Sequence, residues 1–474
     1  MDYPLEPDHE AMEHLAQAVS RLALSFVDAL GERPASPAGI SREAISALQE
    51  RLLTPPGEEA QELGDVLARM QAAAEVAVES AGPGYLAYIP GGGLFAAAVA
   101  DLYARATNRY VGLSAVAPGM AALEYSVVRW LCSVAGLPQG SGGILVSGGS
   151  TANLAALVAA REARLGEAIA DGTLFASEDV HHSIGKAARL AGLPARSVRV
   201  VPATAQRQMD VRAAAGMIAA DRAAGLRPFL LVASAGTTNT GAIDPLADLA
   251  ELAAREGLWY HVDGAYGGLF RLTQRGRARL FGMERADSIT LDPHKGLFMP
   301  YGTGALVVRD LAQLRAAHAV SGAYLQDLAA QEVPDFAELG PELTREVRGL
   351  RVWLPLQLYG VAAFRAALDE KLDLAQHAYR RLAAEPSLEV PWEPPLSVLG
   401  LRVKADDTQR ADALTRQVLE RVNAGERVFL SSTVVQGRFT LRLAILAHRT
   451  HQDRVDEAVD AIIAAARAAR AGGF

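Results

Sequence analysis

Ser288-Ile-Thr-Leu-Asp-Pro-His-Lys-Gly296 is the stretch that decides the fold, because it places Lys295 just after a short apolar strand. A second run, Leu258-Trp-Tyr-His-Val-Asp263, ends another expected strand with an aspartate, 32 residues before the lysine. That spacing accommodates one strand, a crossing segment and the next strand. A pyridoxal phosphate site needs these two groups: an amine that forms a Schiff base with the aldehyde, and a carboxylate that pairs with the protonated ring nitrogen. We therefore expect pyridoxal 5'-phosphate as cofactor, with a helix N-cap as the alternative role for Asp263.

The residues on either side, from about 85 to 310, alternate between short apolar strands and Ala-rich helices. This pattern favours an α/β fold with a mostly parallel sheet covered by helices on both faces. Ligands bind beyond the carboxyl ends of such strands, so Lys295, Asp263, Thr237-Thr238 and Gly148-Gly149 should converge on one edge. The expected strands are 143–146, 173–177, 197–201, 228–233, 258–263, 288–291 and 304–308.

Three regions are expected along the chain. Residues 1–82 form an N-terminal helical segment, with helices at 9–30, from Ser41 as a plausible N-cap, and at about 58–80. Residues 83–365 form the large cofactor-binding domain. Residues 366–474 form a small α+β C-terminal domain. A long helix at 350–383 leads into it from the large domain, and strands at 397–404 and 438–445 and a final helix at 450–470 follow.

Composition narrows the class of protein. Half of the 474 residues are hydrophobic and 21% are charged, which is typical of a compact globular enzyme. The net charge of −8 gives no reason to expect nucleic acid as a partner. The single cysteine, Cys132, excludes a disulfide framework and a cysteine-cluster metal site, and we expect no metal. No run approaches the roughly 18 apolar residues that span a membrane, and the acidic N-terminus lacks a signal pattern, so a cytoplasmic protein without membrane contact is expected.

Ser147-Gly-Gly-Ser-Thr-Ala-Asn153 follows a strand and opens a helix. Glycines let a ligand approach the backbone, and the helix N-terminus offers free N–H groups and partial positive charge, so a phosphate fits there. An ordinary turn capped by Ser150 is the alternative. The run is not a P-loop, because no Gly-Lys-Ser/Thr follows.

Two further segments carry candidate side chains. His181 and His182 follow a strand, and their spacing does not indicate a metal site; one imidazole is expected to stack on the cofactor ring, opposite Ala265. Lys295 lies between apolar runs, a setting in which a lysine amine can act as a nucleophile.

At these motifs the chain resembles the group II pyridoxal phosphate-dependent amino-acid decarboxylases. The resemblance runs from about Pro83 to the end. The matching runs include Pro83-Gly-Tyr-Leu-Ala-Tyr-Ile-Pro, Ser150-Thr-Ala-Asn, His261-Val-Asp-Gly-Ala-Tyr, Asp292-Pro-His-Lys and Arg348-Gly-Leu-Arg-Val-Trp.

The resemblance implies a fold-type I homodimer with active sites at the interface, and decarboxylation of an L-amino acid, with aromatic ones among the candidates, to its amine. It assigns catalytic roles to Lys295, Asp263 and His181. Its other implied contacts are the cofactor-binding residues Gly149, Ser150, Thr238, Ala265 and His294 and the substrate-pocket residues Tyr88 and Pro90.

Three departures leave the product and substrate open. Aligned without gaps from Arg348, the family's mobile-loop tyrosine falls at Phe336, which cannot deliver a proton, although Tyr324 lies nearby. Loss of that tyrosine is associated in the family with aldehyde formation, so an aldehyde synthase acting by decarboxylation-dependent oxidative deamination is the alternative. The pocket is also less aromatic than in aromatic-amino-acid decarboxylases, and Gly296 replaces a common tryptophan and leaves space near the cofactor. From a different class, a non-catalytic paralogue would not need both Lys295 and Asp263.

Overall fold

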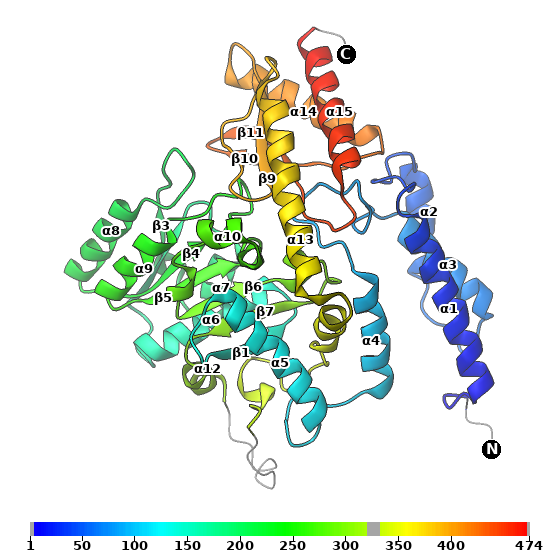
Figure 1. Ribbon diagram of the computed structural model, residues 1–474, viewed down its shortest axis with the longest axis horizontal. Coiled ribbons are helices and arrows are strands. Elements are labelled where there is room, and N and C mark those ends of the chain that lie inside the picture. Colours follow the sequence, from blue (N-terminus) through cyan, green and yellow to red (C-terminus); the bar gives the residue numbers. More distant parts are fainter. Residues whose placement is uncertain (1–3, 320–331, 472–474) are drawn as a thin grey trace.

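In the computed structural model, which describes residues 4–319 and 332–471, two sheets are joined by one long helix (Figure 1). The larger sheet has the strand order β1-β7-β6-β5-β4-β2-β3, and β7 is antiparallel to both of its neighbours. The predicted mostly parallel sheet is thus confirmed. Its strands are β1 Gly142–Val146, β2 Gly172–Ser177, β3 Val198–Val201, β4 Arg227–Ser234, β5 Trp259–Gly264, β6 Ser288–Leu291 and β7 Gly304–Val308.

Helices cover both faces of this sheet, because nearly all of its strands are apolar on both sides. One face packs against α6 (Gly149–Leu165), α7 (Ser183–Leu190) and α12 (Leu311–His318). The other packs against α5 (Pro118–Ala135), α8 (Val211–Ala223), α9 (Leu246–Arg255) and α13 (Leu350–Ala383). The short helices α10 (Gln274–Arg279) and α11 (Pro293–Gly296) follow β5 and β6. In register, Asp263 on β5 lies between Ser234 on β4 and Thr290 on β6.

The C-terminal region forms a second, antiparallel sheet with its own core. Its order is β10-β11-β9-β8, from β8 Leu388–Glu389, β9 Val398–Val403, β10 Ser431–Val435 and β11 Arg438–Ala444. Helices α14 (Thr408–Ala424) and α15 (Gln452–Arg470) pack on it together with the end of α13. Helix α13 bends at Gly360, which has a φ of 71°. The expected boundary at 365/366 falls inside this helix, just after the bend, and the three-region division stays a prediction.

The N-terminal residues form an arm beside the body (Figure 1). It consists of α1 (His9–Ala29), α2 (Arg42–Leu52) and α3 (Leu63–Glu75), and α4 (Phe95–Thr107) follows on the body itself. The Ser41 hydroxyl accepts from the Ala44 N–H, as expected of an N-cap. No residue of α1 or α3 is buried within the described chain. Among the described residues, no helix has the length and apolar character needed to cross a bilayer.

A buried ion pair fixes the start of α13 against α5. The side chains of Glu124 and Arg345 are 0% exposed and lie 2.5 Å apart. The second Glu124 oxygen accepts from the backbone N–H groups of Arg348 and Gly349, each at 2.9 Å. One carboxylate thus neutralises a buried guanidinium and satisfies two backbone N–H donors.

We predict that Glu124→Gln destabilises the fold by about 3–5 kcal/mol, because it leaves the Arg345 charge buried without a partner. The measurement is the shift in chemical and thermal unfolding. Glu251→Gln is the matched control, since Glu251 pairs with Arg285 at 3.3 Å while its side chain is 67% exposed; its effect should stay within about 0.5 kcal/mol. Equal effects of the two changes would contradict the assignment.

Candidate active site

The carboxyl ends of the central strands surround a cavity of about 300 Å³. It lies where the sheet topology places a ligand, beyond β1, β2, β4, β5 and β6. Eight of the predicted residues line it: Gly149, Ser150, His181, Thr238, Asp263, Ala265, His294 and Lys295. The sequence prediction that these residues converge on one edge therefore agrees with the geometry.

Lys295 lies on the short helix α11, directly after β6. Its Nζ is 2.8 Å from Oδ2 of Asp292, whose side chain is 1% exposed. The other Asp292 oxygen, Oδ1, is buried and has no hydrogen-bond partner among the described residues. The lysine amine thus faces the cavity beside a buried carboxylate. The sequence indicated the lysine but gave Asp292 no role.

Asp263 ends β5 with its carboxylate held on both sides. Oδ2 accepts from Nδ2 of Asn153 at 2.9 Å, and Oδ1 accepts from the Ala265 N–H at 3.1 Å. Asp263 is 7% exposed. Burying this charge is tolerable because each oxygen has a donor. Asn153, which also lines the cavity, was quoted in the sequence motif without a role.

His181 contributes an imidazole to the same cavity. Its Nδ1 accepts from the Ser183 N–H at 3.3 Å and lies 2.8 Å from the Ser183 hydroxyl. Burial lowers the pKa of His181, against an opposing effect of the Asp263 charge. A neutral ring with its hydrogen on Nε2 is the form that these contacts favour.

The predicted phosphate turn opens α6. Gly148 is the N-cap, and no side chain in the described structure caps this helix, so its first N–H groups face the cavity. The Ser147 and Thr151 hydroxyls lie 2.9 Å apart across the turn. β7 approaches closely at Gly304, where a Cβ would lie 2.4 Å from the Gly148 Cα. An uncapped helix N-terminus beside hydroxyl donors fits a phosphate.

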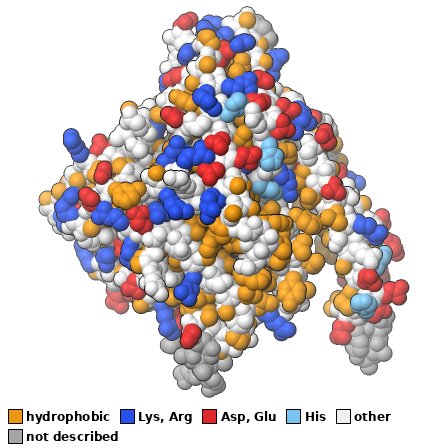
Figure 2. Space-filling model, in the orientation of Figure 1, with side chains coloured by type: hydrophobic (Ala, Val, Ile, Leu, Met, Phe, Trp, Pro, Cys, Tyr) orange, Lys and Arg blue, Asp and Glu red, His pale blue; other side chains and the backbone are white. Residues whose placement is uncertain are grey.

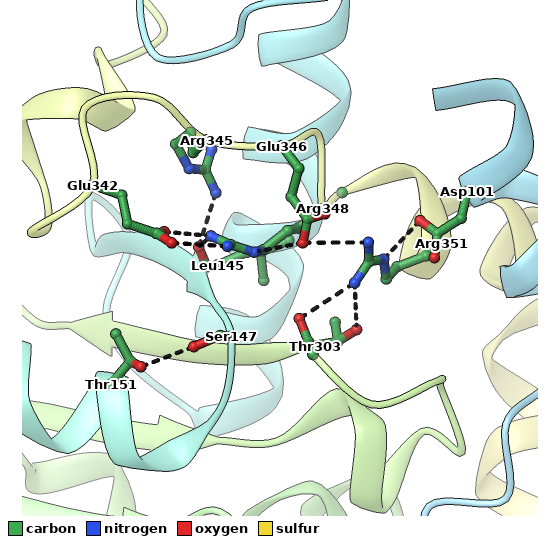
Figure 3. Close-up of polar contacts among 12 residues, drawn as sticks. Asp101, Leu145, Ser147, Thr151, Thr303, Glu342, Arg345, Glu346, Arg348 and Arg351 are labelled. Carbon is green, nitrogen blue, oxygen red and sulfur yellow. Dashed lines mark hydrogen bonds and ion pairs between the residues drawn. The ribbon is translucent and has the colours of Figure 1, made fainter. Parts of the chain in front are cut away.

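Arginines of the 345–351 segment brace both the phosphate turn and the lysine loop (Figure 3). Arg345 Nη2 donates to the Leu145 carbonyl, two residues before Ser147, at 2.8 Å. Arg351 extends from α13 to Asp101 of α4 at 2.8 Å and to the Thr303 hydroxyl at 3.4 Å. The backbone carbonyl of Thr303 in turn accepts from the His294 N–H at 3.1 Å. The segment therefore supports the site from behind without entering it.

Arg442 ties the small sheet to the cavity rim, and sequence reasoning missed it. From β11 it donates to the carbonyls of Thr238 at 2.5 Å, Tyr88 at 3.1 Å and Asn239 at 3.1 Å. Burial lowers the pKa of Arg442 to about 10. A lone arginine in a strand gives no sequence signal for such a role, because its partners are distant backbone carbonyls.

Tyr88 and Pro90 do not line the cavity. Tyr88 is 60% exposed with a φ of 50°, and Pro90 is buried nearby. The segment still passes close, because a Cβ on Gly91 would lie 2.4 Å from the His294 carbonyl oxygen. Their role in substrate binding stays a prediction.

The interpretation of Phe336 is corrected by its position. Phe336 is 0% exposed within a core cluster that includes Ile144 and Leu339, and the Arg345 guanidinium lies 4.8 Å from its ring centre. Phe336 thus packs in the core of its own chain and does not line the cavity. The expectation that it occupies a loop position at the substrate is corrected to a core-packing position. Tyr324, the other candidate, lies outside the described residues.

The space expected beside Gly296 is also corrected. A Cβ there would lie 2.7 Å from the Leu269 Cβ. Leu269, which is fully buried, fills the position, so Gly296 permits close packing and does not enlarge the cavity.

Residues 53–429 match the family model described as the pyridoxal-dependent decarboxylase conserved domain. The chain belongs to this family. It is 33% identical over 373 residues to an aromatic-L-amino-acid decarboxylase of Bacillus atrophaeus, covering 78% of each. It is 34% identical over 375 residues to an L-2,4-diaminobutyrate decarboxylase of Rhizobium meliloti (strain 1021), covering 78% of this chain and 75% of the relative. The crystal structure of Oryza sativa TDC with PLP and tryptamine superposes with a TM-score of 0.92 at 26% identity, over 98% of this chain and 99% of that chain.

The decarboxylase is thus a pyridoxal phosphate-dependent carboxy-lyase, and the expectations of family, fold type and cofactor are confirmed. The residues in the cavity fit this cofactor: an amine for the aldehyde, a buried carboxylate for the ring nitrogen and an uncapped helix N-terminus for the phosphate. A non-catalytic binding protein would not require that set.

A pH prediction follows from His261, which lies on β5 two residues before Asp263. Burial lowers the pKa of His261 from 6.5 to about 4. As the pH falls from about 6.5 to about 4, the unfolded chain takes up a proton here that the folded chain does not, so folding stability decreases over that window. The contribution of this group is roughly 3 kcal/mol.

His261→Gln should remove that part of the acid sensitivity, because glutamine keeps one donor and one acceptor but does not titrate. The check is the unfolding free energy of the two proteins from pH 7 to 4. Parallel pH curves for variant and wild type would contradict the neutral buried imidazole.

Proposed function

We propose that this enzyme decarboxylates an L-amino acid, most favourably an aromatic one, and releases the amine. The observation that carries the proposal is the cavity that holds Lys295, Asp263, His181 and the open N-terminus of α6 together. Support for an aromatic substrate comes from the Bacillus atrophaeus relative and from the tryptamine-bound Oryza sativa structure. The Rhizobium relative makes 2,4-diaminobutyrate the competing substrate to test.

The residue roles follow from chemistry and position. Lys295 would bond the cofactor aldehyde, and Asp263 would pair with the ring nitrogen. Gly149 and Ser150 would hold the phosphate with their N–H groups and the Ser150 hydroxyl. His181 and Ala265 would cover the two faces of the ring, while Thr238 and His294 would border it. When bound, the cofactor supplies an electron sink for the pair left on Cα after CO2 departs.

The protein supplies positioning and proton control. Asp263 keeps its carboxylate oriented because both oxygens are held. A neutral His181 can lie against a ring without bringing a second cationic charge to it. Asp292 can hold the proton-bearing amine of Lys295 at 2.8 Å whenever that amine is not bonded to the cofactor.

We predict that Lys295→Ala reduces amine formation by at least about 10³-fold, since its amine is both the anchor and the returning nucleophile. CO2 release from a panel of L-amino acids, including tryptophan, tyrosine, phenylalanine and 2,4-diaminobutyrate, identifies the substrate. Lys404→Ala is the matched control, because Lys404 is exposed on the small domain and should retain activity. Multiple turnovers by Lys295→Ala would refute the role.

The same assay decides the product. An amine-forming decarboxylase releases CO2 and amine in equal amounts. Hydrogen peroxide and ammonia in equal amount to CO2 would instead identify an aldehyde synthase and overturn the proposed product.

We also propose that two copies of the chain pair through the arm and α4. Hydrophobic side chains gather on the body beside the hollow that separates it from the arm (Figure 2). On α4, Val99, Leu102 and Tyr103 are 46%, 63% and 59% exposed, at a spacing that gives one helix face. On α1, Met12, Leu15, Val19 and Leu24 are 39–50% exposed. Apolar faces on both sides of a hollow support coverage by a second copy.

Leu102→Glu should shift the protein toward single chains, because a charge would be buried in the paired interface. Sedimentation velocity across a dilution series measures the shift. Val434→Glu is the matched control, because Val434 is an apolar side chain that is 59% exposed but lies on β10 of the small sheet. This change should leave the assembly unchanged. A wild-type protein that is a single chain at micromolar concentration would overturn the pairing proposal.

A further inference from the structure

Asn153 is a buried side chain that lines the cavity and links Asp263 to a buried polar network behind it. It is 1% exposed, on the first turns of α6. Its Nδ2 donates to Asp263 Oδ2 and to the Ser183 hydroxyl, each at 2.9 Å. Its Oδ1 lies 2.6 Å from the Thr290 hydroxyl and 3.0 Å from Nε2 of His261. An amide has two donor hydrogens and two acceptor lone pairs, so its capacity is fully used.

The directions of the hydrogen bonds in this network are fixed at Asp263, because a carboxylate only accepts and therefore faces Nδ2 of Asn153. Oδ1 of Asn153 then faces Nε2 of His261, so this nitrogen carries the ring hydrogen and Nδ1 is the acceptor. Nδ1 accepts from the Ser288 hydroxyl, 2.8 Å away, and that hydroxyl in turn accepts from Trp259 Nε1 at 2.8 Å. The neutral His261 keeps its hydrogen on Nε2 and donates to Asn153 Oδ1. The Asn153 amide is therefore held with both N–H groups directed at Asp263 and Ser183.

Two hydrogen-bond paths lead from the Asn153 amide to residues that line the cavity. One ends on the Asp263 carboxylate. The other passes through Ser183, whose hydroxyl lies 2.8 Å from Nδ1 of His181. A side chain needed for packing alone would be better served by an apolar residue, because a buried polar network costs stability unless every member is satisfied. Here every donor of the amide is directed to a residue that lines the cavity or to its hydroxyl partner.

We propose that Asn153 is a positioning residue that aligns the Asp263 carboxylate with the cofactor ring nitrogen and, through Ser183, fixes the tilt and tautomer of His181. The inference rests on the proposed role of Asp263. It predicts that the benefit of Asn153 depends on the ring nitrogen, because an oriented carboxylate stabilises only a ring that carries a positive N–H.

The experiment compares the apoenzyme's affinity for two probes, pyridoxal phosphate and its analogue with C–H in place of the ring nitrogen. Dissociation constants come from absorbance and fluorescence titration, without turnover. Wild type should bind pyridoxal phosphate more tightly. Asn153→Leu, of similar volume but without hydrogen bonds, should weaken pyridoxal phosphate binding about tenfold and analogue binding less than about twofold.

Two further variants separate positioning from general damage. Thr290→Val removes one donor to Asn153 Oδ1, and should weaken binding of pyridoxal phosphate alone by about threefold; it decides the question if Asn153→Leu does not fold. Asn423→Leu is the matched control, since Asn423 bonds the backbone of Leu430 in the small domain at 2.8 and 3.1 Å. It should reduce thermal stability and leave the affinity ratio of the two probes unchanged.

The outcomes are distinct. If wild type discriminates and the Asn153 and Thr290 variants weaken both probes equally, or neither, Asn153 is structural and this inference is overturned while Asp263 keeps its role. If wild type itself binds both probes equally, the proposed pairing of Asp263 with the ring nitrogen fails, and the inference fails with it.

Discussion

A carboxylate at the centre of a buried sheet is the constraint on which the site depends. Asp263 lies near the end of β5, between β4 and β6, where only 7% of the residue is exposed to water. The fold tolerates it because donors from Asn153 and the Ala265 backbone meet both oxygens. The first donor requires the beginning of α6, which carries Asn153, to pack against β5. The second requires the chain to turn directly after Asp263, so that the Ala265 N–H points back at the carboxylate. The phosphate turn and the small residues around Ala265 follow from the same requirement.

The surrounding charges are arranged so that the site is supported from below. Glu124 and Arg345 neutralise each other inside the core, and Arg345 also holds the Leu145 carbonyl ahead of the phosphate turn. Arg351 links α13 and α4 to the loop that follows Lys295. These side chains reach the cofactor residues only through backbone atoms. The charged side chains that line the cavity itself are therefore Asp263, Asp292 and Lys295, and the supporting arginines are not among the lining residues.

The parts of this design that depend on local pattern were predictable from sequence. Apolar runs indicated all seven strands of the large sheet, and the residues that follow β5 and β6 indicated Asp263 and Lys295. Residues whose role depends on distant partners were not predictable: Asn153 and His261 meet across 108 positions, and Arg442 and Thr238 across 204. Phe336 shows the converse error, since ungapped counting from Arg348 assigned a loop role to a side chain that packs in the core.

The groups expected to bind the cofactor and those expected to bind the substrate differ in how far they are exposed. The groups expected to hold the cofactor come from strand ends and helix starts of one chain, and nearly all are buried or half-buried. Tyr88, assigned to the substrate side, is 60% exposed, and Arg442 links it to the cavity rim by donating both to its backbone carbonyl and to that of Thr238. The exposed face of α4 begins a few residues further on, at Phe95. If two chains pair through α4 as proposed, the second copy would lie beside this exposed segment, and pairing would help to exclude water from the substrate side of the cavity.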